Sequence, residues 1–329
     1  MSALLEVRDL YVRYPRSRRV INQITGRGAA WVDVVEGVSL DVSRGETLAI
    51  IGESGSGKTS LIMALMGLVT ARRGDVRFNG EAVGRNVRGR LQPDRRRIAM
   101  MFQDPAGSLS PRMKVRSLLA EPYRIHPGVA DDPDAEVQRL LDLVGLSPEF
   151  ADRYAHQLSG GQARRIGVAR SLALHPDLII ADEPTAGLDV SIQGDVLNLL
   201  SGLQERLGLA LIVITHNLNV VRHIADRMAI MYLGRFLEQG PSEEIFRHAR
   251  HPYTRALLSA NPEPDPDART ERLELTGEVP SLLARPSGCE FHTRCPFVQD
   301  DCRAVFPSPT RLDTEHQVLC HFPLPDPDV

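Results

Sequence analysis

The sequence predicts an α/β fold built around a parallel β-sheet, and three short apolar runs carry that prediction. The runs are TLAII (47–51), LII within DLIIADEP (177–184) and ALIVIT (210–215). They do not alternate and are rich in β-branched residues, a pattern typical of strands buried on both faces of a parallel sheet. Polar residues follow each run, and ligands of open α/β sheets bind at the carboxyl ends of strands. We therefore expect the three strand ends to converge on one site.

Composition sets the broad class of the protein. The chain has 329 residues, 42% of them hydrophobic, which suits one large or two modest globular units. The net charge of −3 gives no indication of a nucleic-acid partner. Apolar runs such as LALIVIT (209–215) are far shorter than the ~20 residues of a membrane-spanning helix. The N-terminal stretch alternates like a strand, so we expect no signal peptide and a cytoplasmic chain.

A phosphate-binding loop follows the first apolar run. GESGSGKT (52–59) fits the pattern G-x-x-x-x-G-K-[ST] and precedes the apolar helix SLIMALMGL (60–68). Glycines let the backbone N–H groups face a phosphate, and the helix N-terminus adds its positive dipole end. Lys58 is expected to reach the β- and γ-phosphates, and the Thr59 hydroxyl to bind Mg²⁺. The residues expected around the nucleotide are Gly52, Glu53, Ser54, Gly55, Ser56, Gly57, Lys58, Thr59 and Ser60.

Two carboxylates end the second apolar run. In LIIADE, Asp182 lies at a buried strand end, where it is expected to hold Mg²⁺ through water. Glu183 follows and is the candidate base for an attacking water molecule. After a phosphate loop, this pair predicts hydrolysis of a nucleotide.

Helices are predicted between the strands. DPDAEVQRLLDLVG (132–145) has Asp132 as N-cap, Pro133 at the first helical position and Gly145 as C-cap. Its apolar residues follow i, i+3, i+4, i+7 spacing. The whole stretch from about 105 to 175 is expected to form an inserted helical subdomain.

LSGGQ (158–162) is the most specific motif, and with it the chain resembles the ATP-binding cassette (ABC) ATPases over roughly residues 4 to 325. Other family motifs follow in order. Gln103 in MFQDP matches the Q-loop, a further Mg²⁺ ligand and water sensor, and GLD (187–189) matches the D-loop. His216 matches the switch histidine, although Asn217 stands where the family usually has Asp. Tyr14 matches the aromatic that stacks on adenine, with Tyr11 as a rival.

The family's working unit is a dimer, and the chemistry of LSGGQ fits it. Ser159 is a good helix N-cap, and Gly160, Gly161 and Gln162 open the helix with exposed backbone N–H groups. The resemblance implies a head-to-tail dimer in which each LSGGQ closes on the ATP of the partner, with Asp189 near the seam.

The resemblance also implies the domain organisation. Residues 1–240 would form an ABC ATPase domain of the P-loop NTPase class, with a RecA-like core, an antiparallel β subdomain and the helical insert. Residues 241–329 would form a small Cys-rich C-terminal extension, after a composition change that includes the linker-like NPEPDPDART.

Three segments narrow the resemblance to ATPase subunits of oligopeptide/dipeptide importers. They are FQDPAGSLSPRMKV (102–115), HPYTRALLSANP (251–262) and GEVPSLLARPSGCEFHTRCPF (277–297). The implied partners are two integral-membrane permease subunits, a second ATPase subunit and an extracytoplasmic solute-binding protein. The implied location is the cytoplasmic face of the inner membrane, as a peripheral subunit that takes up the permeases' coupling helices near its Q-loop.

All four cysteines lie at the C-terminal end of the chain, spaced C-x₅-C-x₆-C-x₁₇-C at Cys289, Cys295, Cys302 and Cys320. Four thiolates in a cytosolic segment can hold a metal ion or an iron–sulfur cluster. The spacing alone leaves iron–sulfur, zinc and free or disulfide-forming thiols open. The resemblance implies a 4Fe-4S cluster, because the subfamily's corresponding cysteines hold one.

Two other functional classes compete with transport. A non-transport ABC ATPase acting on nucleic acid or the ribosome usually carries two cassettes and a basic arm, whereas this chain has one phosphate loop and no net positive charge. An ATPase of iron–sulfur assembly would explain the cysteines but not the importer-like extension. We therefore expect no nucleic-acid partner.

Overall fold

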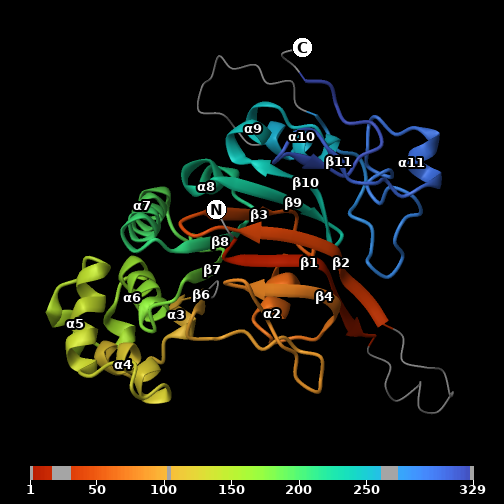
Figure 1. Ribbon diagram of the computed structural model, residues 1–329. Coiled ribbons are helices and arrows are strands. Elements are labelled where there is room, and N and C mark those ends of the chain that lie inside the picture. The colour runs from red at the N-terminus through yellow and green to blue at the C-terminus, as the bar shows by residue number, and fades with distance from the viewer. Residues whose placement is uncertain (1–2, 17–30, 102–104, 261–272, 327–329) are drawn as a thin grey trace. The chain divides into compact units, whose positions relative to one another are not determined.

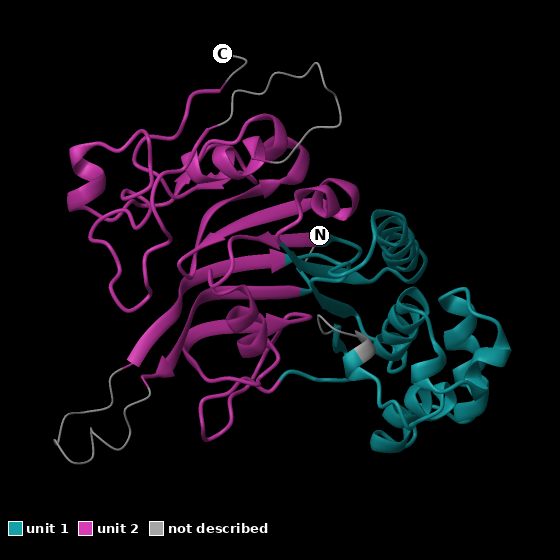
Figure 2. Ribbon diagram, turned by 180° about the vertical axis from the view of Figure 1, so that it is seen from behind, with its two compact units in different colours: residues 1–4, 42–47, 93–215 teal, residues 5–41, 48–92, 216–329 magenta. Residues whose placement is uncertain are grey.

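The computed structural model describes residues 3–16, 31–101, 105–260 and 273–326, which divide into two compact units (Figures 1 and 2). Unit 1 comprises residues 1–4, 42–47 and 93–215. Unit 2 comprises residues 5–41, 48–92 and 216–329. Residue 240, the predicted end of the ATPase domain, lies inside unit 2. The predicted domain boundary therefore does not coincide with a boundary between the units, and it stays a prediction.

Unit 1 has three parallel strands in the order β8–β7–β6. They are β6 (Ile98–Met101), β7 (Leu178–Asp182) and β8 (Ala210–Thr215). Every residue of β7 and β8 is buried, as the non-alternating apolar runs predict. The residues of β6, IAMM, are too few to show a period in the sequence.

The helices of unit 1 lie in the predicted helical region, about residues 105 to 175, except for the last one, which follows β7 (yellow to green in Figure 1). They are α3 (Pro105–Ser108), α4 (Val115–Ile125), α5 (Pro133–Leu143), α6 (Gly160–Leu172), α7 (Val190–Leu207) and the 3-10 turns Pro148–Asp152 and Ala155–Gln157.

Helix α5 forms as its sequence predicts. The side chain of Asp132 accepts hydrogen bonds from the backbone N–H groups of Asp134 and Ala135, which stabilises such a helix by about 1 kcal/mol. Gly145 lies in the left-handed region at φ 66, and the N–H of Leu146 donates to the carbonyl of Leu141 at 2.9 Å. This pattern is a Schellman motif, which ends the helix.

Unit 2 contains two sheet segments. The antiparallel one has the order β2–β1–β4–β5, and the other has the order β11–β12–β10–β9–β3, in which β3 and β9 are parallel. The strands are β1 (Leu5–Pro15), β2 (Trp31–Val42), β3 (Thr47–Ile51), β4 (Ala71–Phe78), β5 (Glu81–Ala82), β9 (Arg227–Tyr232), β10 (Arg235–Pro241), β11 (Thr310–Arg311) and β12 (Gln317–Val318).

The helices of unit 2 are short. They are α2 (Lys58–Leu65), α8 (Leu218–Ile224), α9 (Ser242–Arg247), α10 (Pro252–Ser259) and α11 (Asp300–Ala304). NPEPDPDART (261–270) lies outside the described residues.

The C-terminal segment shares its core with the strand that leads into the phosphate loop. Ile51 of β3 belongs to the same buried cluster as Tyr232, Tyr253, Phe291 and Cys289. The rings of Tyr232 and Tyr253 lie 4.9 Å apart, and each lies within 5.5 Å of Phe291. Such aromatic pairs contribute about 0.5–1.5 kcal/mol each beyond the area they bury. The extension therefore packs into unit 2 and does not build a core of its own.

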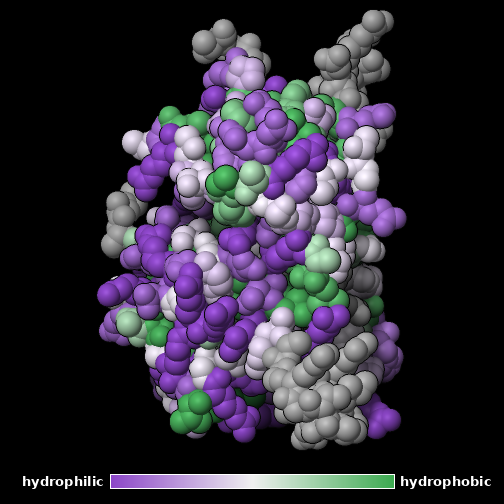
Figure 3. Space-filling model, turned by 90° about the vertical axis from the view of Figure 1, so that its right-hand side faces the viewer, coloured by the Kyte–Doolittle hydropathy of each residue, from purple (hydrophilic) through white to green (hydrophobic). Residues whose placement is uncertain are grey.

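One face of the molecule is mainly hydrophilic, and hydrophobic side chains gather on it only in small groups (Figure 3). Among the described residues, no helix has both the length and the apolar character that crossing a membrane requires.

Candidate functional site

The phosphate loop connects β3 to α2 in unit 2. Gly55 and Gly57 both have positive φ, at 78° and 106°, which permits the tight turn before the helix. Lys58 is buried, and its ammonium group donates to the carbonyls of Gly52 (2.7 Å) and Glu53 (2.9 Å). It also donates to the hydroxyl of Ser56 at 3.3 Å. The ammonium group of Lys58 therefore lies against the carbonyls of the loop. We expect it to contact the nucleotide phosphates that this loop binds.

Neighbouring backbone fixes the loop so closely that two of its glycines have no room for a side chain. A Cβ on Gly52 would lie 2.2 Å from the carbonyl oxygen of Met231, and one on Gly57 would lie 2.8 Å from that of Val34. The N–H of Gly234, in the turn between β9 and β10, donates to the carbonyl of Ser56 at 2.7 Å. Thr59 is exposed at the first turn of α2, and so are Ser54 and Gly55 in the loop. Ser60 is partly buried.

The carboxylate pair lies at the carboxyl end of β7 in unit 1. Asp182 is buried, and Glu183 adopts φ 49, a conformation that a non-glycine residue rarely takes. The backbone N–H of Glu183 donates to the carbonyl of Ile214 at 2.8 Å, and its carboxylate accepts a hydrogen bond from the Thr215 hydroxyl at 3.2 Å. The ends of β7 and β8 thus position this carboxylate together. The expected convergence with the end of β3 stays a prediction.

Arg164 is a functional residue that the sequence reasoning missed. It lies in α6, is buried, and its guanidinium donates to the carbonyls of Glu183 (3.4 Å), Pro184 and Ala186 (2.9 Å). Five donors in a planar fork suit several carbonyls of one turn. The arginine follows LSGGQ by two positions, but nothing in that motif indicates its target, since the contact is between segments about twenty residues apart.

LSGGQ opens helix α6 with a capping box. The Ser159 hydroxyl accepts from the N–H of Gln162 at 3.3 Å, and the Gln162 side chain accepts from the N–H of Ser159 at 3.0 Å. Ser159 and Gly160 are exposed, and Gly161 and Gln162 are partly buried. The helix therefore presents its N-terminal turn at the surface of unit 1.

The remaining motif residues are placed as follows. Asp189 is exposed and caps α7, accepting from the N–H of Ile192 at 3.0 Å. His216 is exposed, and Asn217 caps α8, accepting from the N–H of Asn219 at 3.0 Å. Asn217 stands where the family usually has Asp, and its side chain still caps the helix. Gln103 lies outside the described residues.

Tyr14 and its rival Tyr11 both lie on β1 and are partly buried. The guanidinium of Arg73 covers the ring of Tyr11, 3.9 Å from its centroid. One face of the Tyr11 ring is therefore occupied, which favours Tyr14 as the adenine contact; that role stays a prediction.

The four cysteines line one narrow pocket of unit 2, with about 10 Å³ of free volume. All four are free thiols, and His251, Phe291 and His292 line the same pocket. Burial raises the pKa of Cys289 to about 11 and that of Cys320 to about 12, so both thiols are protonated at neutral pH. Within the described part of the chain, no three His, Cys, Asp or Glu side chains are grouped tightly enough to hold a metal ion. The pocket gathers the thiols without forming a ready single-ion site.

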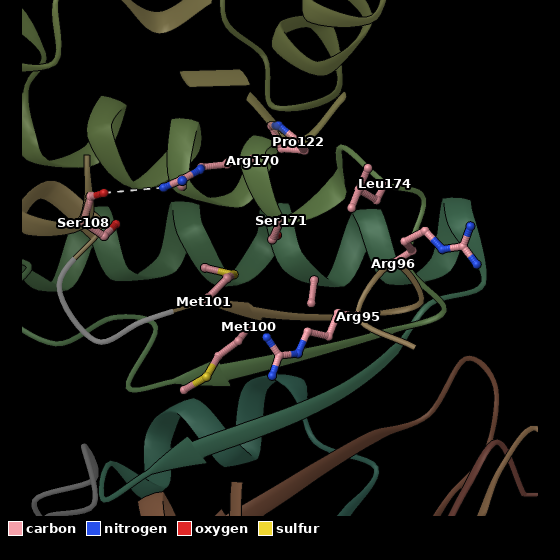
Figure 4. A pocket seen from close by; sticks show the side chains of 11 residues that line it. Arg95, Arg96, Met100, Met101, Ser108, Pro122, Arg170, Ser171 and Leu174 are labelled. Carbon is pink, nitrogen blue, oxygen red and sulfur yellow. Dashed lines mark hydrogen bonds between the residues drawn. The ribbon is translucent and has the colours of Figure 1, made fainter. Parts of the chain in front are cut away.

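A second cavity, of about 220 Å³, lies in unit 1 beside the strand that leads to the Q-loop (Figure 4). Met100 and Met101 of β6, Pro122 of α4 and Ser171 of α6 line it. Arg170 bridges its wall, donating to the carbonyl of Ser108 at 3.4 Å and to Glu121 at 2.5 Å. Methionines give such a surface an adaptable apolar lining.

Protein-family models match two parts of the chain. The family described as "ABC transporter" matches residues 35–186, and the one described as "Oligopeptide/dipeptide transporter, C-terminal region" matches residues 237–302.

Curated relatives match nearly the whole chain. The di/tripeptide transport ATP-binding protein DppF of Pseudomonas aeruginosa is 42% identical over 322 residues, covering 98% of each chain. The oligopeptide transport ATP-binding protein AppF of Bacillus subtilis is 42% identical and covers 97% of each. A putative peptide import ATP-binding protein of Brucella ovis is 45% identical over 293 residues, 89% of this chain and 92% of the relative.

Solved structures share the fold. CbiO1 from Clostridium perfringens, part of the ABC transporter complex cbiONQ, superposes with a TM-score of 0.63 at 28% identity, covering 75% of this chain and 91% of that one. The ATP-binding cassette MJ0796, in a dimeric post-hydrolysis state bound to ADP and Pi, gives a TM-score of 0.60 at 25% identity. That match covers 72% of this chain and 98% of the cassette.

Proposed function

Because this chain belongs to the family of ATP-binding subunits of oligopeptide/dipeptide ABC transporters, we propose that it is the ATP-hydrolysing motor of a peptide importer. The single observation that carries the ATPase mechanism is the presence of two glycine-rich helix N-termini in one chain, each suited to binding a phosphate. One is the phosphate loop before α2, and the other is the capped LSGGQ turn before α6. Two such starts on one chain suit a head-to-tail dimer, in which each ATP contacts one start from each subunit.

The chain's residues divide the chemistry of ATP hydrolysis. The phosphate loop and Lys58 would bind the β- and γ-phosphates, once the lysine exchanges its loop carbonyls for phosphate oxygens. Thr59 and Asp182, with Gln103, offer the oxygen ligands that Mg²⁺ prefers. When bound, Mg²⁺ neutralises charge on the transferring phosphoryl group.

Glu183 would act as the general base. Its carboxylate accepts a proton from a water molecule whose oxygen attacks the γ-phosphorus, while the bond from that phosphorus to the β–γ bridging oxygen breaks and ADP leaves. The hydrogen bond from Thr215 orients the carboxylate. His216 would contact the γ-phosphate, Asp189 would lie at the dimer seam, and Tyr14 would stack on adenine.

Glu183→Gln tests this assignment. The variant keeps the shape of the side chain and the Thr215 contact but cannot accept the proton, so ATP should bind and hydrolysis should stop. We expect ATP-bound dimers to accumulate, as measured by light scattering after size-exclusion chromatography with and without ATP. Hydrolysis at the wild-type rate would show that Glu183 is not the base.

The cavity of about 220 Å³ in unit 1 is the proposed contact for the membrane subunits. Family membership implies permease subunits and dimerisation. An amphipathic coupling helix would lay its apolar face on the partly buried Met100 and Pro122, in the manner of helix-in-groove recognition. The solute-binding protein, the second ATPase subunit and the location at the cytoplasmic face of the inner membrane belong to the same proposal.

The four cysteines are proposed to hold a 4Fe-4S cluster through Cys289, Cys295, Cys302 and Cys320. Their shared pocket supplies four thiol donors, which is the ligand set such a cluster uses. A tetrahedral zinc ion on the same four thiolates is the alternative. The thiols enclose only about 10 Å³ and, among the described residues, form no tight metal-ligating group, so the pocket would have to rearrange for either metal centre. Binding would displace the thiol protons, so we expect it to weaken as the pH falls. The bound cluster would supply cross-links between distant parts of the extension.

Metal analysis after anaerobic purification tests the cluster. We expect iron and acid-labile sulfide at about four each per chain, with the broad visible absorption of a cluster. Zinc at one per chain without iron would contradict it.

A further inference from the structure

The Cys-rich segment reaches the phosphate loop through one ion pair. Arg294, which directly precedes Cys295, donates from both terminal nitrogens to the two carboxylate oxygens of Glu53, at 2.8 and 3.1 Å. The arginine side chain is 8% exposed and that of Glu53 is 27% exposed. A bidentate pair with so little water around it fixes both side chains, and removing one partner would leave a charge buried without compensation.

Glu53 is held at its backbone as well. Its N–H donates to the hydroxyl of Tyr253 at 3.2 Å, and its carbonyl accepts from Lys58 at 2.9 Å and from the N–H of Ser56 at 3.2 Å. Burial raises the pKa of Tyr253, so its hydroxyl stays protonated and neutral. The carboxylate and the N–H are thus held by the C-terminal extension, whereas the carbonyl is engaged by the loop itself.

A second arginine of the extension supports the same side of the loop. Arg285 donates to the carbonyls of Leu233 (2.7 Å) and Asp33 (2.8 Å), and pairs with Glu290 at 2.6 Å. Leu233 precedes Gly234, whose N–H holds the carbonyl of Ser56. The loop is therefore braced at Glu53 and at Ser56, in each case by groups that the Cys-rich extension positions.

We propose that Arg294 is a positioning residue of the ATPase, which sets the geometry of Glu53 and through it the affinity of the phosphate loop for ATP. The proposal rests on the proposed ATPase function and not on which metal the cysteines hold. It gives the extension a role in the reaction, because Arg294 lies between Cys289 and Cys295 and is the residue of that stretch whose side chain pairs with the Glu53 carboxylate.

A double-mutant cycle tests the proposal on the full-length chain. The variants are Arg294→Gln, Glu53→Gln and the two combined, and the readout is the Kd for the fluorescent nucleotide MANT-ATP with Mg²⁺. Arg294→Gln should raise the Kd at least about fivefold, the lower end of typical coupling between sites. The double variant should be no weaker than the weaker single variant, because both changes break one interaction. It also removes both charges, which keeps the test available if a single variant misfolds.

Two further variants separate positioning from structural support. Arg303→Gln, an exposed arginine of the same segment, should leave the Kd unchanged. Arg294→Lys keeps the charge but loses the fork, so it should recover only part of the affinity. A melting temperature lowered by Arg294→Gln with an unchanged Kd would overturn the proposal, and so would additive effects in the cycle. If the wild-type chain itself fails to bind MANT-ATP, the ATPase function fails, whereas wild-type binding with an unaffected Arg294→Gln defeats only this inference.

Discussion

At the scale of single residues, the site depends on backbone that is held in unusual conformations. Glu183 at φ 49 is the clearest case, since a positive φ costs conformational energy in a residue that has a side chain. Arg164 holds three carbonyls of residues 183–186 and so fixes the turn that aims the carboxylate. We therefore expect Arg164 to act on the geometry of hydrolysis and not on nucleotide binding.

Arg164→Lys should slow hydrolysis with little change in ATP affinity. Lysine keeps the charge but cannot serve several carbonyls from one planar group, so the turn loosens and the carboxylate moves from its position. Misplacing a catalytic group by about 1 Å can cost up to about a hundredfold, so we expect kcat to fall about ten- to a hundredfold.

The matched control is Arg165→Lys, at the next position of the same helix. Arg165 donates instead to the carbonyl of Val144, at the end of α5, at 2.7 Å. Steady-state kcat and MANT-ATP affinity of both variants decide the matter. A similar loss of kcat in the two, or a loss confined to affinity, would contradict the role given to Arg164.

The residue scale also shows the limit of sequence reasoning. The phosphate-loop residues, Asp182, Glu183 and Ser159 were predicted because their motifs are contiguous and each carries its own chemical reason. Arg164, Thr215, Arg294 and Tyr253 were missed because their partners lie far along the chain, up to 241 residues away for Arg294 and Glu53. Only packing in space brings such pairs together.

At the scale of elements, β7 is fixed at its beginning by a charged cluster. Asp177 pairs with Arg44 and Arg97 at 2.6 Å each, while its N–H donates to the carbonyl of Arg97 and its own carbonyl accepts from Ala210. Burial alone would raise the pKa of Asp177, but the hydrogen bonds and charges of Arg97 and Arg44 together outweigh it and lower that pKa below 3.8. The carboxylate therefore ties the start of β7 to Arg97, just before β6, whereas the start of β8 is held by the backbone carbonyl of Asp177.

Asp177→Asn should lower the free energy of unfolding by about 1 kcal/mol at neutral pH, since both arginines are partly exposed and solvent screens them. Because the folded pKa is lowered, this contribution is present above pH 3.8 and is lost as the pH falls through the folded value. Urea unfolding of both proteins should give a constant difference from about pH 8 to 5 that shrinks in stronger acid. A difference that persists in strong acid would mean that the charge of Asp177 does not matter.

Strands were predicted correctly where they are buried along their whole length. A helix was predicted correctly where it is long enough to show its apolar period. β3, β7, β8 and α5 formed as predicted, because a fully apolar run or a capped amphipathic helix has one good solution. β9 and β10 were not predicted, although β9 is almost wholly buried, because RMAIMY is short and Met-rich and gives no strand signal of its own. The turn that joins them nevertheless holds Ser56 of the phosphate loop.

At the scale of the whole molecule, the chain combines an ATPase with a C-terminal extension that packs against its phosphate loop. The sequence indicated both parts, but not the core that they share around Ile51, Tyr232 and Phe291. That core depends on contacts between segments about 240 residues apart, which no local pattern displays. We therefore expect substitutions in the extension to change the affinity for the nucleotide.

We propose that this ATPase drives a peptide importer. Identifying the proteins that co-purify with the chain is the first measurement to make. A tagged full-length chain would be purified from detergent-solubilised membranes of the native host, with its partners identified by mass spectrometry. We expect two multi-spanning permease subunits in that fraction, with or without a second ATPase subunit. Recovery from the soluble fraction alone, with ribosomal, DNA-repair or iron–sulfur-assembly proteins, would contradict transport while leaving the ATPase chemistry in place.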